Sequence, residues 1–169
     1  HLGCIVAGDI GCYTLGVLPP FEAMDTCVCM GAAIGVGLGL RHVLPPDQAK
    51  KVVSVIGDST FVHSGITGLV EMTYNPPPTG HVLIILDNST TAMTGGQRTI
   101  LTSSRLEKLI HGLGVDPDHI KLIVPLKKHT GENAEIIRRE IEHQGVSVVI
   151  ALRDCIQTLK ERKKKEAGQ

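Results

Sequence analysis

The stretch VVSVIGDSTF, residues 52–61, decides the fold. Its apolar, β-branched run over residues 52–56 predicts a buried strand, and Gly57 and Asp58 then turn the chain into a helical pattern that begins near Phe61. Strand, turn and helix in this order form the repeating unit of a parallel sheet covered by helices. The stretch therefore predicts an α/β fold.

The same alternation runs outward in both directions along the 169 residues. Short apolar runs predict strands over residues 4–7, 52–56, 82–86, 121–124 and 146–151. Longer helical patterns predict helices over residues 30–43, 61–74, 104–113 and 132–144. We therefore expect a single domain over residues 1–169, with three α/β/α layers around a mostly parallel sheet.

The two ends of the sequence differ from the rest. The chain opens on His1 rather than on methionine and enters a buried-looking apolar run almost at once, which indicates a fragment of a longer polypeptide. Residues 159–169 are rich in lysine and arginine, and we expect them to form a solvated charged tail.

The composition excludes several classes of partner. Lysine plus arginine equals aspartate plus glutamate, at 17 each, so no net positive field exists to attract nucleic acid or an anionic membrane. Trp is absent and only two Tyr and two Phe occur, which removes the stacking platforms of single-stranded nucleic-acid binders. The apolar stretch over residues 30–40 is too short and too rich in glycine to span a bilayer. Five cysteines in mostly apolar stretches indicate a reducing, cytoplasmic compartment.

Three loop segments are the candidates for function. Ligands of open α/β sheets bind beyond the carboxyl ends of the strands, so the residues that directly follow each predicted strand deserve inspection. These segments are residues 8–12, 57–60 and 87–91. Because the predicted strands are parallel, we expect the three segments to meet along one edge of the sheet.

The residue types in these segments favour a phosphate and a metal ion. Gly57 lets a ligand approach the backbone, and the N–H groups of the following helix start can bind phosphate oxygens. Asp58 would repel phosphate unless a cation lies between them, and Mg²⁺ prefers oxygen ligands of this kind. The amide oxygen of Asn88, the backbone carbonyl of Thr90, two diphosphate oxygens and one water would complete an octahedral shell. The alternative for Asp58 and Asn88 is a helix cap and a turn residue.

The context of these residues resembles a known family. GDSTFVHSG at residues 57–65 and LDNSTTAMTGGQ at residues 86–97 resemble the thiamine-diphosphate (ThDP) motif, in which Gly-Asp-Gly is followed about thirty residues later by Asn. The two stretches are similar to the large subunit of the indolepyruvate:ferredoxin oxidoreductases, and the likeness extends over residues 3–155. Ser59 departs from the third glycine of the general motif. The resemblance implies a ThDP diphosphate-binding domain.

The resemblance also assigns roles to individual residues. Met30 matches the bulky apolar residue that wedges between the two rings of ThDP and enforces its bent conformer, although ordinary core packing is the alternative. The metal ligands would be Asp58, Asn88 and Thr90. The expected cofactor-binding residues are Gly11, Cys12, Met30, Gly57, Asp58, Ser59, Thr60, Asn88, Thr90, Thr91 and Ala92.

Two further residues are candidates for chemistry. Cys12 would lie near the thiazolium, but no Lys or Arg neighbours it in sequence to activate the thiol, so we expect it to position and pack. His63 follows the phosphate turn and could bind substrate or cofactor, with an ordinary helix histidine as the alternative. Cys27 and Cys29 form a Cys-x-Cys pair without the longer run that an iron–sulfur cluster needs, so we expect any cluster to lie elsewhere in the enzyme.

The resemblance implies an activity that this chain cannot complete alone. It implies oxidative decarboxylation of an arylpyruvate such as indolepyruvate, with electrons passed to ferredoxin and the acyl group to coenzyme A. The glutamate that activates ThDP would lie on a separate pyrimidine-binding domain, and a smaller partner subunit is also expected. Alternatives are a non-oxidative ThDP decarboxylase of the sulfopyruvate type and a non-catalytic nucleotide-binding module.

Overall fold

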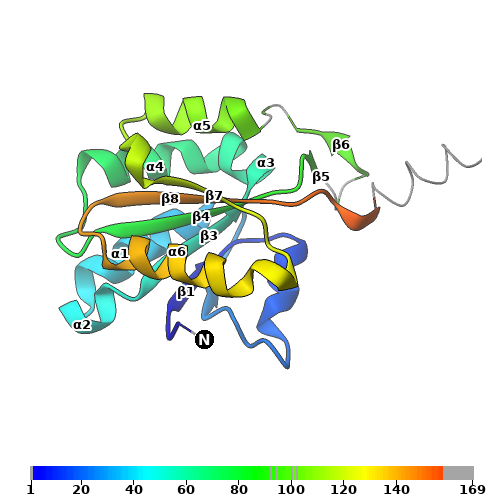
Figure 1. Ribbon diagram of the computed structural model, residues 1–169. Helices are drawn as coiled ribbons and strands as arrows, with labels where there is room; N and C mark the ends of the chain where they lie inside the picture. Colours follow the sequence, from blue (N-terminus) through cyan, green and yellow to red (C-terminus); the bar gives the residue numbers. More distant parts are fainter. Residues whose placement is uncertain (1, 92, 94, 100, 102, 158–169) are drawn as a thin grey trace, which may run out of the picture.

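The computed structural model describes residues 2–91, 93, 95–99, 101 and 103–157. Six strands form one sheet in the order β2-β1-β3-β4-β8-β7, and every neighbouring pair is parallel (Figure 1). Their bounds are β1 Ile5–Gly8, β2 Thr26–Cys27, β3 Val52–Gly57, β4 His81–Asp87, β7 Ile120–Ile123 and β8 Val146–Leu152. A small antiparallel pair, β5 Thr90–Thr91 and β6 Gln97–Arg98, follows β4.

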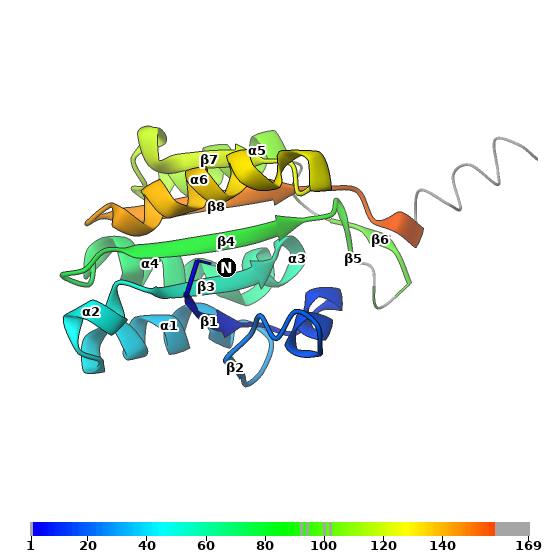
Figure 2. The ribbon, with the colours of Figure 1, turned by 60° about the horizontal axis from the view of Figure 1, so that its bottom comes forward.

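Helices cover both faces of the sheet. The helices α1 (Ala32–Val43), α4 (Ile66–Tyr74) and α5 (Ser103–Gly112) pack against one face, and α6 (Thr130–Glu142) packs against the other. Figure 2 shows α6 in front of the sheet and α4 behind it. This arrangement confirms the predicted three-layer architecture. None of the helices in the part of the chain that the structure describes is long and apolar enough to cross a membrane.

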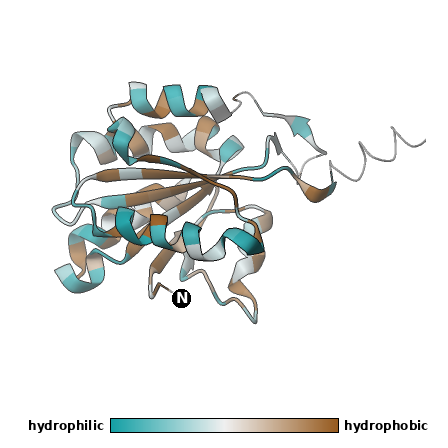
Figure 3. Cartoon of the chain, viewed as in Figure 1, coloured by the Kyte–Doolittle hydropathy of each residue, from teal (hydrophilic) through white to brown (hydrophobic). Residues whose placement is uncertain are grey.

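Each face of the sheet has its own hydrophobic core. Alternate residues of β4 point to opposite faces, with Leu83 and Ile85 in the core under α1, α4 and α5. Val82 lies in the smaller core under α6. In Figure 3 the strands are largely hydrophobic, while α5 and α6 carry hydrophilic residues. The sheet is therefore buried on both sides by amphipathic helices, as parallel sheets require.

Most of the predicted elements are present, but some boundaries and several short elements differ. All five predicted strands occur within one residue of their expected ends, and three of the four helices within two. The start of the helix predicted over residues 61–74 is wrong, because helical structure already begins at Asp58. It continues as α3 (Asp58–Thr60), a π-helical segment (Phe61–Gly65) and α4. The predicted tail over residues 159–169 lies outside the described residues.

Elements too short to show a hydrophobic period were not predicted. Among the elements that the structure describes, these are β2, β5, β6, the helix α2 (Pro46–Ala49) and the 3-10 segments Cys12–Val17, Pro117–His119 and Lys127–His129. A run of two to six residues buries too little of one face to leave a periodic signal. Two of these elements, β5 and the first 3-10 segment, turn out to border the candidate site.

A buried arginine fixes the far end of α1. Arg41 is only 3% exposed, and burial lowers the pKa of its guanidinium to about 10. The guanidinium donates to four backbone carbonyls, those of Lys50, Val52, Thr79 and Gly80. These bonds tie α1 to the amino-terminal ends of β3 and β4. The opposite end of α1 begins at Ala32, two residues after Met30, and lies at the carboxyl edge of the sheet.

Candidate functional site

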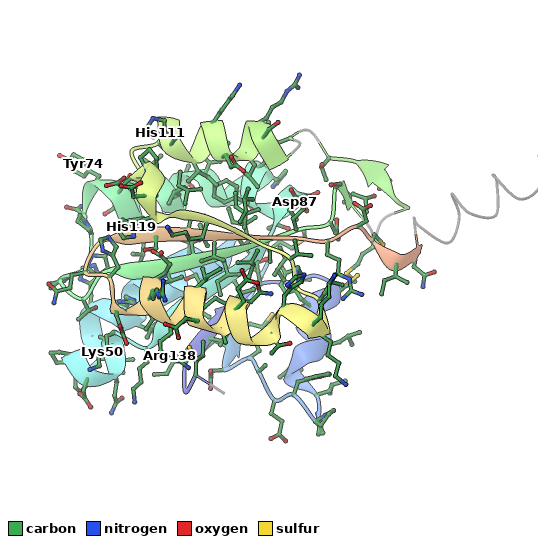
Figure 4. All side chains as sticks on the ribbon, viewed as in Figure 1. Lys50, Tyr74, Asp87, His111, His119 and Arg138 are labelled. Atoms are coloured by element: carbon green, nitrogen blue, oxygen red, sulfur yellow. The ribbon has the colours of Figure 1, made fainter. Side chains whose placement is uncertain are left out.

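The three predicted loop segments meet at the carboxyl edge of the sheet. They line a cavity of about 330 Å³ between the ends of β1, β3 and β4. Figure 4 shows Asp87 near this end of the sheet, whereas Lys50, Tyr74 and His119 lie toward the other. The lining includes ten of the eleven predicted cofactor residues: Gly11, Cys12, Met30, Gly57, Asp58, Ser59, Thr60, Asn88, Thr90 and Thr91. The eleventh, Ala92, lies outside the described residues.

A second cavity of about 320 Å³ adjoins the first. Met30, Asp58 and the residues after it belong to both, and the side chain of Met30 is 59% exposed where the two meet. The second cavity adds a mostly apolar wall made of Val62, His63, Thr99, Leu101 and Leu106. His63 thus lines only the second cavity, and Met30 lies at the boundary rather than in the core.

Asp58 is the most unusual residue of the site. It is 6% exposed, and its Oδ1 accepts a hydrogen bond of 2.8 Å from the Ser59 N–H. Its other oxygen, Oδ2, is buried without a hydrogen-bond partner. Burial, followed by the neighbouring Asp87 carboxyl, raises the pKa of Asp58 to about 7, against the effect of the Ser59 N–H. A buried carboxylate oxygen without a donor is costly unless the group takes up a proton, which the raised pKa favours, or a cation binds it.

The turn after β4 presents Asn88 to the same cavity. The Thr90 N–H donates to Asn88 Oδ1 at 3.0 Å, and the Ser89 N–H donates to Asp87 Oδ1 at 2.9 Å. Ser89 adopts a left-handed conformation with φ 57°, which closes the turn tightly. Thr90 is buried, and its hydroxyl donates to the Gln97 carbonyl at 3.0 Å. The turn is therefore held rigidly beside Asp58.

Hydroxyl groups link the three loops around the cavity. The oxygens Ser59 Oγ and Thr91 Oγ1 lie 3.0 Å apart and join the turn after β3 to β5. The Gly57 N–H donates to the Tyr13 hydroxyl at 2.9 Å, which joins the same turn to the loop after β1. The helical run that starts at Asp58 also directs its first N–H groups toward this edge, where they favour an anion.

Four residues that line the first cavity were not among the predicted ones: Ile10, Tyr13, Leu86 and Met93. Asp9 and Asp87, also not predicted, are buried beside it. A signal existed for Asp87 and Asp9, since each stands in a segment that directly follows a strand. The position of Tyr13 depends on the 3-10 segment Cys12–Val17, which left no periodic pattern.

The cysteines are free thiols. Cys12 is exposed and lines the first cavity, whereas Cys27 and Cys29 are exposed outside both cavities. Among the described residues, no group of three His, Cys, Asp or Glu side chains is placed to hold a metal ion. A site built on one carboxylate, one amide oxygen and a backbone carbonyl does not need such a group.

Comparison with known proteins identifies the family of the chain. Residues 9–151 match the model of the thiamine pyrophosphate enzyme C-terminal TPP binding domain. The chain belongs to this family of thiamine pyrophosphate enzymes. The matched range starts in the loop after β1 and ends in β8, so it includes every loop that lines the first cavity.

Individual relatives agree with the family. Over 157 residues the chain is 41% identical to the "indolepyruvate oxidoreductase subunit IorA" of Archaeoglobus fulgidus, covering 87% of this chain and 24% of that protein. The chain thus spans about a quarter of the length of the curated relatives it matches. The resemblance inferred from the residues is confirmed by this similarity.

Solved structures share the fold at low identity. The 2-oxoglutarate:ferredoxin oxidoreductase from Magnetococcus marinus superposes with a TM-score of 0.67 at 16% identity, over 89% of this chain and 54% of that one. Benzoylformate decarboxylase from Polynucleobacter necessarius superposes with a TM-score of 0.56 at 14% identity, over 90% of this chain and 31% of that one. The TPP-binding domain fold therefore occurs in enzymes with different reactions.

The raised pKa of Asp58 predicts how the metal-free chain responds to pH. Because the folded-state pKa of about 7 lies above the usual value near 3.9, the folded protein binds the extra proton, and stability falls as pH rises from about 4 to 7. We expect Asp58→Asn to stabilise the metal-free chain at pH 8, by on the order of 1–2 kcal/mol after solvent screening, and to have little effect at pH 4. Chemical denaturation at the two pH values measures this. Asp154→Asn, at an exposed aspartate, is the control, and an equal gain at both pH values would refute the assignment.

Proposed function

We propose that this chain binds ThDP through Mg²⁺ as the diphosphate-binding part of a 2-oxoacid:ferredoxin oxidoreductase that acts on arylpyruvates such as indolepyruvate. The observation that carries the proposal is the buried Asp58 Oδ2, which has no hydrogen-bond partner in a cavity that Asn88 also lines. The name of the 41% identical relative supports the choice of indolepyruvate, which is a proposal for this chain.

The residues present fit the metal ion. Asp58 would bind Mg²⁺ through its unpartnered oxygen, and Asn88 Oδ1 has a second lone pair besides the one that accepts from Thr90 N–H. The backbone carbonyl of Thr90 is the third proposed ligand. A cation here would favour the ionised form of Asp58 and would neutralise diphosphate oxygens next to that carboxylate.

The diphosphate would lie against the start of the helical run. Gly57 is extended, with φ −80° and ψ 153°, and Asp58 then begins the helix. The N–H groups of the first turn and the hydroxyls of Ser59 and Thr91 lie at the cavity wall. These groups donate to phosphate oxygens without bringing a second positive charge into the site.

Met30 is placed to shape the cofactor. When bound, ThDP supplies the carbanion and the electron sink of the reaction. Met30 lines both cavities, so its thioether can pack against a bent ligand that occupies the two. The apolar wall of the second cavity, which includes Val62 and Leu101, would exclude water next to the reacting atoms and accommodate an apolar side chain.

The rim of the site indicates a docking partner. A group of large apolar side chains is exposed in the segment between β1 and α1: Ile10, Leu15, Val17, Leu18, Phe21, Val28 and Met30. An exposed patch of this kind marks an interaction surface. We propose that the pyrimidine-binding domain of the same enzyme covers it and brings the activating glutamate. The smaller subunit, the iron–sulfur cluster, ferredoxin and coenzyme A would then act outside this chain, in the cytoplasm.

Binding of ThDP and of Mg²⁺ should depend on each other. We expect calorimetry to show that EDTA or Asp58→Ala lowers ThDP affinity at least about 100-fold, the order expected when a buried charged group loses its partner. Asn88→Ala should act in the same direction. Asn133→Ala is the matched control, since Asn133 is half-buried in α6 on the opposite face of the sheet, donates to the Val124 carbonyl and lines neither cavity. Affinity that does not respond to EDTA would exclude a metal-bridged site.

The chain alone should bind ThDP without completing the reaction. The pyrimidine ring would lack its acid partner, and general acid–base help of that kind contributes ~10² to 10⁴ in rate. We expect the isolated chain saturated with Mg²⁺ and ThDP to release carbon dioxide from indolepyruvate at least about 100-fold more slowly than the complete enzyme. Comparable rates would place the activating acid within these residues. Decarboxylation by the complete enzyme without ferredoxin reduction would instead support the sulfopyruvate-type alternative.

A further inference from the structure

We propose that Asp9 is a positioning residue that holds Met30 in place through the first turn of α1. Asp9 lies in the loop after β1, and its side chain is 0% exposed. It does not line either cavity, so it has no direct contact with a ligand there. Its effect on the site has to pass through the residues that it hydrogen-bonds. The inference rests on the proposed function where it concerns Met30.

Both oxygens of the Asp9 carboxylate accept hydrogen bonds from backbone N–H groups. Its Oδ2 accepts from the Gly31 N–H at 2.8 Å and from the Ala33 N–H at 3.2 Å. Its Oδ1 accepts from the Ile10 N–H at 2.8 Å. No ion pair to Asp9 occurs among the residues that the structure describes, so the N–H groups and the positive end of α1 stabilise the charge.

The start of α1 lacks a cap of its own. The residue at the cap position is Gly31, which has no side chain to accept a hydrogen bond and adopts φ 89°. A Cβ at Gly31 would lie 2.3 Å from Ser64 Oγ, so the backbone directly after Met30 packs against the π-helical segment. Asp9 on one side and Ser64 on the other therefore determine where Met30 projects.

Further hydrogen bonds hold the loop that contains Asp9 and join it to Gly57, the residue before Asp58. The Thr14 hydroxyl donates to the Asp9 carbonyl at 3.0 Å and accepts from the Gly11 N–H at 2.9 Å. One residue earlier, the Tyr13 hydroxyl accepts from the Gly57 N–H at 2.9 Å. One short loop thus fixes the distance between the wedge residue and the turn that carries Asp58. A substitution at Asp9 that loosens this loop should alter the relative position of the two ThDP rings, while the contacts to the diphosphate remain.

The first test compares two aspartates of the complete enzyme whose carboxylates both accept from backbone N–H groups, the buried Asp9 and the exposed Asp25. Asp9→Asn keeps the size of the side chain but replaces one acceptor oxygen by a donor. Asp25→Asn is the matched control, because Asp25 Oδ2 also accepts from a backbone N–H of β1, that of Val6 at 2.7 Å. We expect Asp9→Asn to lower kcat about 10- to 100-fold, as a displacement near 1 Å at reacting atoms does. The Kd of ThDP should change less than about 3-fold, and Asp25→Asn should leave both unchanged.

A double-mutant cycle tests whether Asp9 acts through Met30. If it does, the double variant Asp9→Asn/Met30→Ala will have the kcat of Met30→Ala alone, because Met30→Ala removes the side chain that Asp9→Asn would displace. Multiplying effects, or a loss of ThDP affinity in parallel with kcat, would overturn the proposal.

Hydrogen exchange provides a readout that does not need turnover. In Asp9→Ala, which removes both acceptor oxygens, the amides of Gly31 and Ala33 should exchange faster, while Asp25→Ala leaves them protected. Protected amides in Asp9→Ala would contradict the cap itself. If these amides do exchange faster but Met30→Ala turns over normally, the wedge role in the proposed function is wrong and the Asp9 cap remains.

Discussion

A buried carboxylate with one unsatisfied oxygen is the constraint on which the site depends. Asp58 is placed by the last residue of β3 and by the start of a helix, both of which the fold requires, and the position leaves Oδ2 without a donor. Burial of the Asp58 carboxyl also raises its pKa to about 7. A protein keeps such a group when a ligand compensates for it, and the surrounding N–H and hydroxyl groups indicate an anion joined by a cation.

Register explains why residues thirty apart act together. In the parallel pair β3–β4, Gly57 pairs with Leu86, so Asp58 and the turn that contains Asn88 leave the sheet side by side. The intervening helical run returns the chain to the start of β4 and fixes the spacing in sequence. Asp58, Asn88 and Thr90 could therefore be predicted from sequence, because strand–helix–strand alternation and the carboxyl-edge rule suffice to bring them together.

Other parts of the site depend on contacts that carry no periodic signal. Tyr13 reaches Gly57 from a 3-10 segment, and Asp9 caps a helix that starts more than twenty residues later. His63, the candidate that follows the turn after β3, stands in the π-helical segment and lines the second cavity, a position that the sequence did not specify. Such positions follow from tertiary packing, which local propensity does not encode. The role proposed for the exposed apolar side chains between β1 and α1 likewise could not be predicted from sequence, because it depends on their position at the rim of the cavity.

The central claim is that a divalent metal joins Asp58 to the diphosphate of ThDP. A crystal structure of the chain grown with Mn²⁺ and ThDP, with anomalous diffraction to locate the metal, tests it most directly. The account predicts an anomalous peak within coordination distance of Asp58 Oδ2 and Asn88 Oδ1 and of diphosphate oxygens. A cofactor bound in the cavity with no metal at Asp58, or a metal bound away from the diphosphate, would contradict it.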